Sequence, residues 1–181
     1  KADFGLSDFQ IGLVNGLAFA VLNVVLGLVV ARYAERTRRL TLIAVGTFFW
    51  SLATAATGLA TSFAQLLAAR IGVGVGEAVG LPSSSSVISD YYPPDKRASA
   101  ISVSMLSPPV GAFIGAAGGS LIAHSYGWQM ALFAAAMPGL ILAIVLHLFL
   151  EEPKRGQHDA LESADDVPSM VQVITRYLTW P

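Results

Sequence analysis

Two opposite charges, Arg70 and Glu77, lie inside an otherwise uncharged stretch, residues 63–89, that is long enough to cross a bilayer. A charged side chain at the bilayer centre costs about 2.5 to 3.5 kcal/mol, so such residues usually face a partner or a water-filled cavity. On a helix, a spacing of seven residues brings two side chains within about 20° of one face and about 10 Å apart along the axis. We therefore expect a charged pair that borders a path for a solute.

These two residue types have separate chemical uses in such a place. Removal from water disfavours the charged form of a carboxyl group, so Glu77 is the candidate group that binds and releases a proton. Arg70 is the candidate to hold an anionic substrate group, or the Glu77 carboxylate in one state of a cycle. The alternative interpretation is structural, with both residues in a buried charge network that only locks helices together.

The composition is that of a membrane protein. Of 181 residues, 54% are hydrophobic and 13% are charged, and the mean hydropathy is +0.62. Uncharged runs that meet the ~20 residues of a spanning helix occupy residues 9–31, 40–60, 98–123 and 127–150, and the charged-pair segment 63–89 makes a fifth. The runs lack the alternation of barrel strands and are about twice their length. The sequence therefore predicts an all-α membrane protein.

Basic residues gather in alternate connections between these runs, at Arg32, Arg36, Arg38, Arg39, Lys96, Arg97, Lys154 and Arg155. The excess of Lys and Arg on one side marks that side as cytoplasmic. We expect a multi-pass integral protein of the cell (inner) membrane, with no nucleic-acid partner. The near-zero net charge of −1 hides this sidedness and by itself says nothing about nucleic acid.

Signals for enzymatic or cofactor chemistry are weak. The chain has no cysteine, and His124, His147 and His158 are widely separated, so no metal and no cofactor is expected. No phosphate-binding loop of the GxxxxGK[ST] type occurs, which disfavours an ATP-driven pump. An intramembrane enzyme with Glu77 as general base is disfavoured too, because the serines at 83–86 have no nearby histidine in sequence.

Glycines recur every four residues in two of the runs, and prolines interrupt three. The first glycine stripe comprises Gly72, Gly76 and Gly80 and lies about 110° around the helix from the charged pair. The second comprises Gly111, Gly115 and Gly119. Both stripes predict close helix packing. Prolines 82, 108, 109 and 138 predict kinks. Static kinks and helices that bend during a transport cycle both remain open.

A cytoplasmic salt-bridge latch is a second candidate site. It comprises Glu35 and Arg36 of the first basic loop with Asp90 and Arg97 of the next. Exposed pairs contribute only about 0 to 1 kcal/mol each, so a latch must act as a network. The plain alternative is that the basic residues only set the orientation.

Several strings resemble the major facilitator superfamily of secondary transporters. They are AERTRR (34–39), with Glu35 where Asp is usual and Arg38 where Gly is common, RIGVGVGEA (70–78), PPVGAFIGAAGG (108–119) and GWQMALF (127–133), with Gln129 for a frequent Arg. Within the superfamily, the closest resemblance is to the Spinster family, through LSDFQIGL (6–13), GEA (76–78), SVISDYYPPDKRASA (86–100), MPGL (137–140) and EEPKRG (151–156).

This resemblance implies an N-terminal helical bundle with five of its six helices present, numbers two to six, over residues 1–150. Residues 151–181 would be the cytoplasmic central linker and the start of the next helix, and the remainder of the transporter would lie outside this chain. The implied function is proton-coupled transport of an amphiphilic, lysolipid-like or sphingolipid-like, anion by alternating access, with Glu77 as protonation site, Arg70 as its cavity partner, and Glu35, Arg36 and Asp90 as the gate. Two alternatives stay open: an organic-acid importer of the anion:cation symporter type, and a non-transporting scaffold or channel subunit.

Overall fold

The structure is a computed structural model that describes residues 37–158 and six isolated positions before them, residues 7, 9, 12, 16, 25 and 26. Most of the expected first span, 9–31, lies outside the described residues, as do Glu35, Arg36 and the linker from residue 159 onward.

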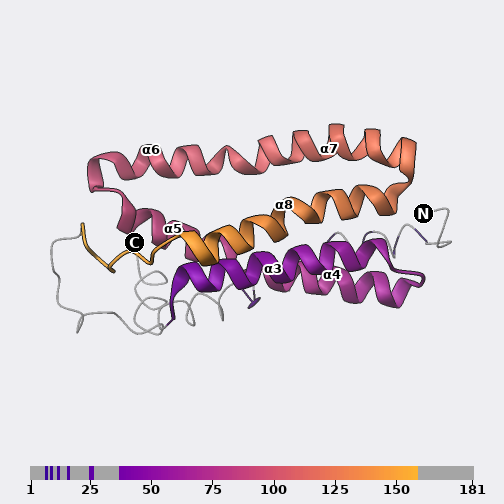
Figure 1. The fold of residues 1–181 in the computed structure, drawn as a ribbon, viewed down its shortest axis with the longest axis horizontal. Coiled ribbons are helices and arrows are strands. Elements are labelled where there is room, and N and C mark those ends of the chain that lie inside the picture. The colour runs from indigo at the N-terminus through magenta and orange to yellow at the C-terminus, as the bar shows by residue number, and fades with distance from the viewer. Residues whose placement is uncertain are drawn as a thin grey trace, which may run out of the picture.

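The described part of the chain is helical throughout, which confirms the predicted all-α class. Its helices are α3 (Arg39–Gly58), α4 (Phe63–Glu77), α5 (Gly80–Tyr91), α6 (Pro94–Met105), α7 (Ser107–Tyr126) and α8 (Trp128–Phe149). They run along the long axis of the molecule, with α4 packed on α3, and α8 packed between α3 and α7 (Figure 1).

Within residues 37–158, three helical stretches are each long and apolar enough to cross a membrane: α3, the joined pair α6 and α7 over Pro94–Tyr126, and α8. The expected span 63–89 is instead divided into α4 and α5 by a turn at Ala78 and Val79. Proline has no backbone N–H, so Pro82 cannot donate to the carbonyl four residues earlier, that of Ala78. Both turn residues keep right-handed helical dihedral angles, so the interruption is local.

A similar interruption separates α6 from α7 at Leu106. Pro108 and Pro109 cannot donate to the carbonyls of Ser104 and Met105, and the helix loses its regular pattern where these bonds are missing. Pro138, by contrast, lies inside α8 without ending it.

Glycines let α4 and α8 approach α3 closely. A Cβ atom on Gly76 would lie 2.7 Å from the backbone oxygen of Gly46 and from the backbone nitrogen of Trp50, and one on Gly139 would lie 2.1 Å from Ser51 Oγ. Lipid tails are as apolar as the helices, so membrane helices associate largely through such close packing. The contacts of α3 with α4 and α8 therefore form the centre of the described bundle.

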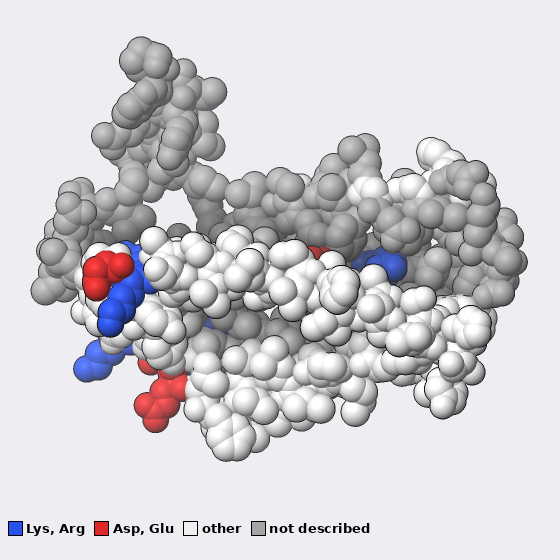
Figure 2. All heavy atoms as spheres, turned by 90° about the horizontal axis from the view of Figure 1, so that it is seen from above, with Lys and Arg blue, Asp and Glu red and all other residues white. Residues whose placement is uncertain are grey.

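The outer faces of the helices are apolar. Helix α7 has no buried residue, and Phe113 and Leu121 on it are 76% and 72% exposed. Figure 2 shows that Lys, Arg, Asp and Glu gather mainly at one end of the visible described surface, while most of the length is uncharged. This distribution suits helices surrounded by hydrocarbon with one charged end in water.

Candidate functional site

A buried arginine joins three segments at the charged end of the molecule. Arg39, the first residue of α3, is only 4% exposed, and Asp90 near the end of α5 is 5% exposed. The Arg39 guanidinium pairs with Asp90 through Nη1 and with Glu152 through Nε, at 3.1 Å. Its Nη1 also donates to Ser86 Oγ at 2.7 Å. We call Arg39, Asp90 and Glu152 the Arg39 cluster.

Glu152 binds the backbone of α3 as well as its side chain. Its Oε1 accepts a hydrogen bond from the N–H of Arg39 at 3.0 Å, and its Oε2 accepts one from the N–H of Leu40 at 2.8 Å. Partial burial raises the pKa of this carboxyl group, but the hydrogen bonds from Leu40 and Arg39 outweigh burial, so its pKa lies below the ordinary value. Glu152 therefore caps a helix whose own N-cap residue, Arg38, supplies no side-chain cap.

The segment after α8 closes over the end of α5. Gly156 has a positive φ of 65°, which favours glycine, and its N–H donates to Asp90 Oδ1 at 2.9 Å. Tyr91 donates through its hydroxyl group to the carbonyl of Glu151 at 2.6 Å, and Arg155 Nη2 donates to the carbonyl of Thr37 at 2.8 Å. These contacts hold the start of α3, the end of α5 and the segment after α8 together in one polar unit.

Two of the four residues expected in a cytoplasmic gate fall in this region. Asp90 belongs to the Arg39 cluster, and Arg97 on α6 donates from Nη2 to the carbonyl of Ser89 at 2.8 Å. Sequence reasoning did not single out Arg39 or Glu152. Both residues belong to motifs that resemble the family, AERTRR and EEPKRG. Their contact, however, spans 113 positions and has no local signature in the sequence.

Arg70 and Glu77 both lie on the unbroken helix α4, so their predicted helical spacing holds. Arg70 is half-buried, and its enclosed Nε has no hydrogen-bond partner among the described residues. Glu77 is exposed and is the last residue of α4, directly before the interruption at Ala78 and Val79. Within residues 37–158, neither charge has a salt-bridge partner.

The glycine stripes differ in their surroundings. Gly76 faces α3, and a Cβ on Gly72 would lie 3.1 Å from Ala53 Cβ. Gly80, Gly111, Gly115 and Gly119 have no described atom within 4 Å of a Cβ position, so for these four the predicted packing role stays a prediction. The described histidines, aspartates and glutamates include no group of three that could hold a metal ion.

The sequence profile described as Major Facilitator Superfamily matches residues 1–178 of the chain. The chain belongs to the major facilitator superfamily. Its fold is similar to that of a bacterial homologue of the human lysosomal transporter Spinster, in an inward-facing and unoccupied conformation, with a TM-score of 0.77 and 33% identity over 89% of this chain and 39% of that one. The Spinster-like resemblance is therefore confirmed.

Two curated relatives of this superfamily member are transporters of different solutes. A sphingosine-1-phosphate transporter of Danio rerio is 30% identical over 88% of this chain and 32% of its own length. A hexuronate transporter of Bacillus subtilis is 31% identical over 83% of this chain and 35% of its own length. The chain thus spans about a third of the length of these relatives. The family and these homologues are transporters and not enzymes, and family membership confirms a multi-pass integral membrane protein.

Proposed function

We propose that this protein is a proton-coupled secondary active transporter that moves an amphiphilic or organic anion by alternating access. The observation that carries the proposal is the placement of Arg70 and Glu77. They lie on one apolar helix, about 110° around it from the glycine stripe that includes Gly76, and neither has an ion-pair partner among the described residues.

Each charge has a role in this proposal. The Glu77 carboxylate takes up a proton in one conformation and releases it in the other, and its position at the end of α4 couples it to the interruption before α5. The Arg70 guanidinium offers donors to the anionic group of the substrate, or to Glu77 when the carboxylate is charged. Protons and the substrate then compete for one charged face.

The cytoplasmic gate in this proposal consists of Glu35, Arg36, Asp90 and Arg97. The Arg39 cluster supports it, because the cluster holds the ends of α3 and α5 and the segment after α8 as one unit. A unit of this kind moves as a body while the contacts at its margin form and break. Contacts of about 1 kcal/mol each at this margin are sufficient to bias two conformations of similar free energy.

An amphiphilic anion is the preferred substrate class. It is supported by the likeness to the zebrafish sphingosine-1-phosphate transporter. The second candidate is the import of a sugar acid, and the likeness to the Bacillus hexuronate transporter favours it. Both candidates place an anion beside Arg70, so the apolar part of the substrate decides between them.

Uptake by the full-length protein in proteoliposomes tests the proposal. We expect a pH gradient to drive uptake of a lysophospholipid, and Glu77→Gln to abolish the pH-driven component. Glu151→Gln is the matched control, because it removes an equal charge from an exposed side chain with no described partner. Undiminished proton coupling in Glu77→Gln would overturn the role of Glu77.

Counterflow separates the two substrate classes. Uptake of labelled lysophospholipid that is stimulated by internal lysophospholipid, but not by a hexuronic acid, supports the preferred class. The opposite pattern supports the sugar-acid importer, and no counterflow with either compound argues for a scaffold or channel subunit.

A further inference from the structure

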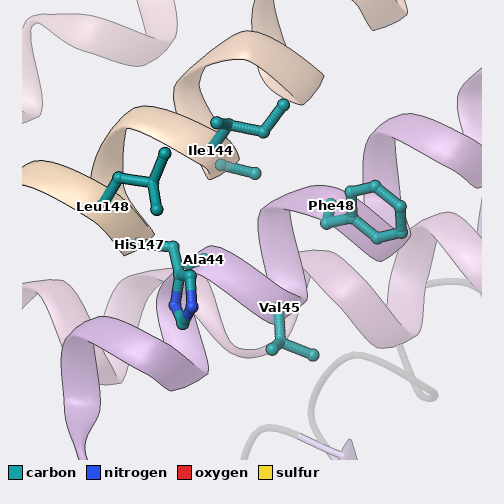
Figure 3. A pocket seen from close by; sticks show the side chains of 7 residues that line it. Ala44, Val45, Phe48, Ile144, His147 and Leu148 are labelled. Carbon is teal, nitrogen blue, oxygen red and sulfur yellow. The ribbon is translucent and has the colours of Figure 1, made fainter.

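A groove lies between α3 and α8. Its volume is about 310 Å³, and its floor consists of two buried alanines, Ala44 and Ala143, each 4% exposed. Its walls are exposed apolar side chains, Val45 and Phe48 of α3 and Ile144 and Leu148 of α8 (Figure 3).

The groove ends at a polar notch near the charged end of the molecule. His147 lies between α8 and α3 in Figure 3 and lines both the groove and the notch. The notch has a volume of about 90 Å³, and Arg38, Thr41 and Glu152 supply its polar groups. An apolar trough is thus continuous with a small polar end, which is the pattern of an amphiphile.

The charge balance of the notch favours an anion. Both oxygens of Glu152 already accept hydrogen bonds from Arg39 and Leu40, and Arg39 shares its positive charge between Glu152 and Asp90. The exposed guanidinium of Arg38 has no ion-pair partner among the described residues. Arg155 adds a second cation nearby, because it donates to the carbonyl of Thr37 beside Arg38.

The length of the site matches one leaflet of a bilayer. Arg38 and Phe48 are ten residues apart along α3, which corresponds to about 15 Å at 1.5 Å per residue. That length equals half of a hydrocarbon core of about 30 Å. The basic residues at the notch, Arg38 and Arg155, match the membrane surface on the cytoplasmic side, where anionic phospholipids attract Lys and Arg.

We propose that this groove is a binding site for one anionic phospholipid of the cytoplasmic leaflet. The acyl chain lies on Ala44 and Ala143 between the four apolar walls, and the phosphate group lies in the notch beside Arg38, with His147 and Thr41 as further hydrogen-bonding groups. The bound lipid bridges α3 and α8 beside the Arg39 cluster and stabilises the approach of the two helices. The site is separate from Arg70 and Glu77, so it does not depend on which solute the protein carries.

Native mass spectrometry of the full-length protein tests the head-group contact. The probes are phosphatidylglycerol and phosphatidylcholine with identical acyl chains. We expect phosphatidylglycerol to bind more tightly, and Arg38→Gln to weaken its binding about fivefold, the factor that corresponds to the ~1 kcal/mol of one basic residue at an anionic surface. The matched control Lys96→Gln removes an exposed charge from α6 and should leave binding unchanged. Equal losses in the two variants, or equal binding of the two lipids, would overturn the proposal.

Two further variants test the apolar contact and the location. Phe48→Ala should weaken binding of both lipids, whereas Phe113→Ala, which removes an exposed ring from α7, should not. Arg70→Gln should leave phosphatidylglycerol binding intact. If Arg70→Gln abolishes binding while Arg38→Gln does not, the lipid occupies the proposed transport site and the groove assignment is wrong. A groove that is filled by a second copy of the protein, with no bound lipid, would refute it equally.

Discussion

The carboxylate of Glu152 accepts a hydrogen bond from the backbone N–H of Leu40 at 2.8 Å, although 112 positions separate the two residues. The same carboxylate accepts the N–H of Arg39 and pairs with the Arg39 guanidinium. A charged group that satisfies two of the unpaired donors at a helix start also interacts favourably with the helix dipole. The segment after α8 is therefore anchored to the first turn of α3.

Replacing Glu152 by Gln should release this anchor. Hydrogen bonds to charged groups contribute about 1.5 to 3 kcal/mol each, but Glu152 is partly exposed, so we expect a total loss of ~1 to 2 kcal/mol after screening. Thermal unfolding and faster hydrogen exchange at the first turn of α3 measure it. Glu151→Gln serves as the control, and equal behaviour of the two variants would count against the anchor.

The anchor should also depend on pH with a defined sign. The pKa of Glu152 is lower in the folded protein than its ordinary value of 4.5, so the unfolded state binds the proton more tightly. The contribution of Glu152 to stability is thus fully present above pH 4.5 and is lost as the pH falls through the lower, folded-state pKa. Hydrogen exchange at Arg39 and Leu40 should stay slow from neutral pH to about pH 5 and rise below pH 4.5, relative to a helix-centre reference. The profile of Glu152→Gln should lack this step.

Breaking the ion pair between Arg39 and Asp90 should lower the free energy of unfolding more than Glu152→Gln does. Asp90→Ala leaves a buried guanidinium with only the Glu152 carboxylate as counter-ion, and removal of one partner from a buried pair costs about 3 to 5 kcal/mol. We expect a loss near the lower figure, measured by thermal unfolding in detergent. A double-mutant cycle with Arg39→Gln should show strong coupling, and additive losses would contradict the pairing.

A test of the gate needs variants other than Asp90→Ala, because Asp90→Ala also destabilises the folded protein. Arg36→Ala and Arg97→Gln each remove one basic charge of the proposed gate and should shift the balance of inward-open and outward-open states with little effect on unfolding. Site-directed labelling of cysteines introduced on the cytoplasmic side measures the shift. Unchanged labelling in both variants would remove these residues from the gate.

Gly76 should tolerate no side chain, whereas glycines with open surroundings should. A Cβ at Gly76 would meet the backbone of Gly46 and Trp50 at 2.7 Å, so Gly76→Ala must push α4 away from α3. We expect a loss of about 1 to 3 kcal/mol, as for other overpacked sites. Gly115→Ala, with no described atom within 4 Å, should change stability by less than about 0.5 kcal/mol. A large loss at Gly115 would instead point to the helix packing that the sequence predicts there.

The sequence by itself determined the properties that follow from local composition and helical period. Apolar run length identified the membrane class and located α3 and α8 within a few residues, because a helix across hydrocarbon must satisfy its backbone internally. The expected run 98–123 falls across α6 and α7. The spacing of Arg70 and Glu77 determined their shared helix face for the same local reason. Pro82, Pro108 and Pro109 indicated where two long helices are interrupted, since each missing N–H affects a carbonyl only four residues away, whereas Pro138 does not end α8.

Only the tertiary structure decided which distant residues meet. Asp90 pairs with Arg39, and Glu152 caps α3, because α5 and the segment after α8 end beside the start of α3. Of the predicted glycine stripes, the packing of α4 on α3 selects Gly72 and Gly76. Such contacts depend on the relative position of whole helices, and neither the helical repeat nor a short motif encodes that position.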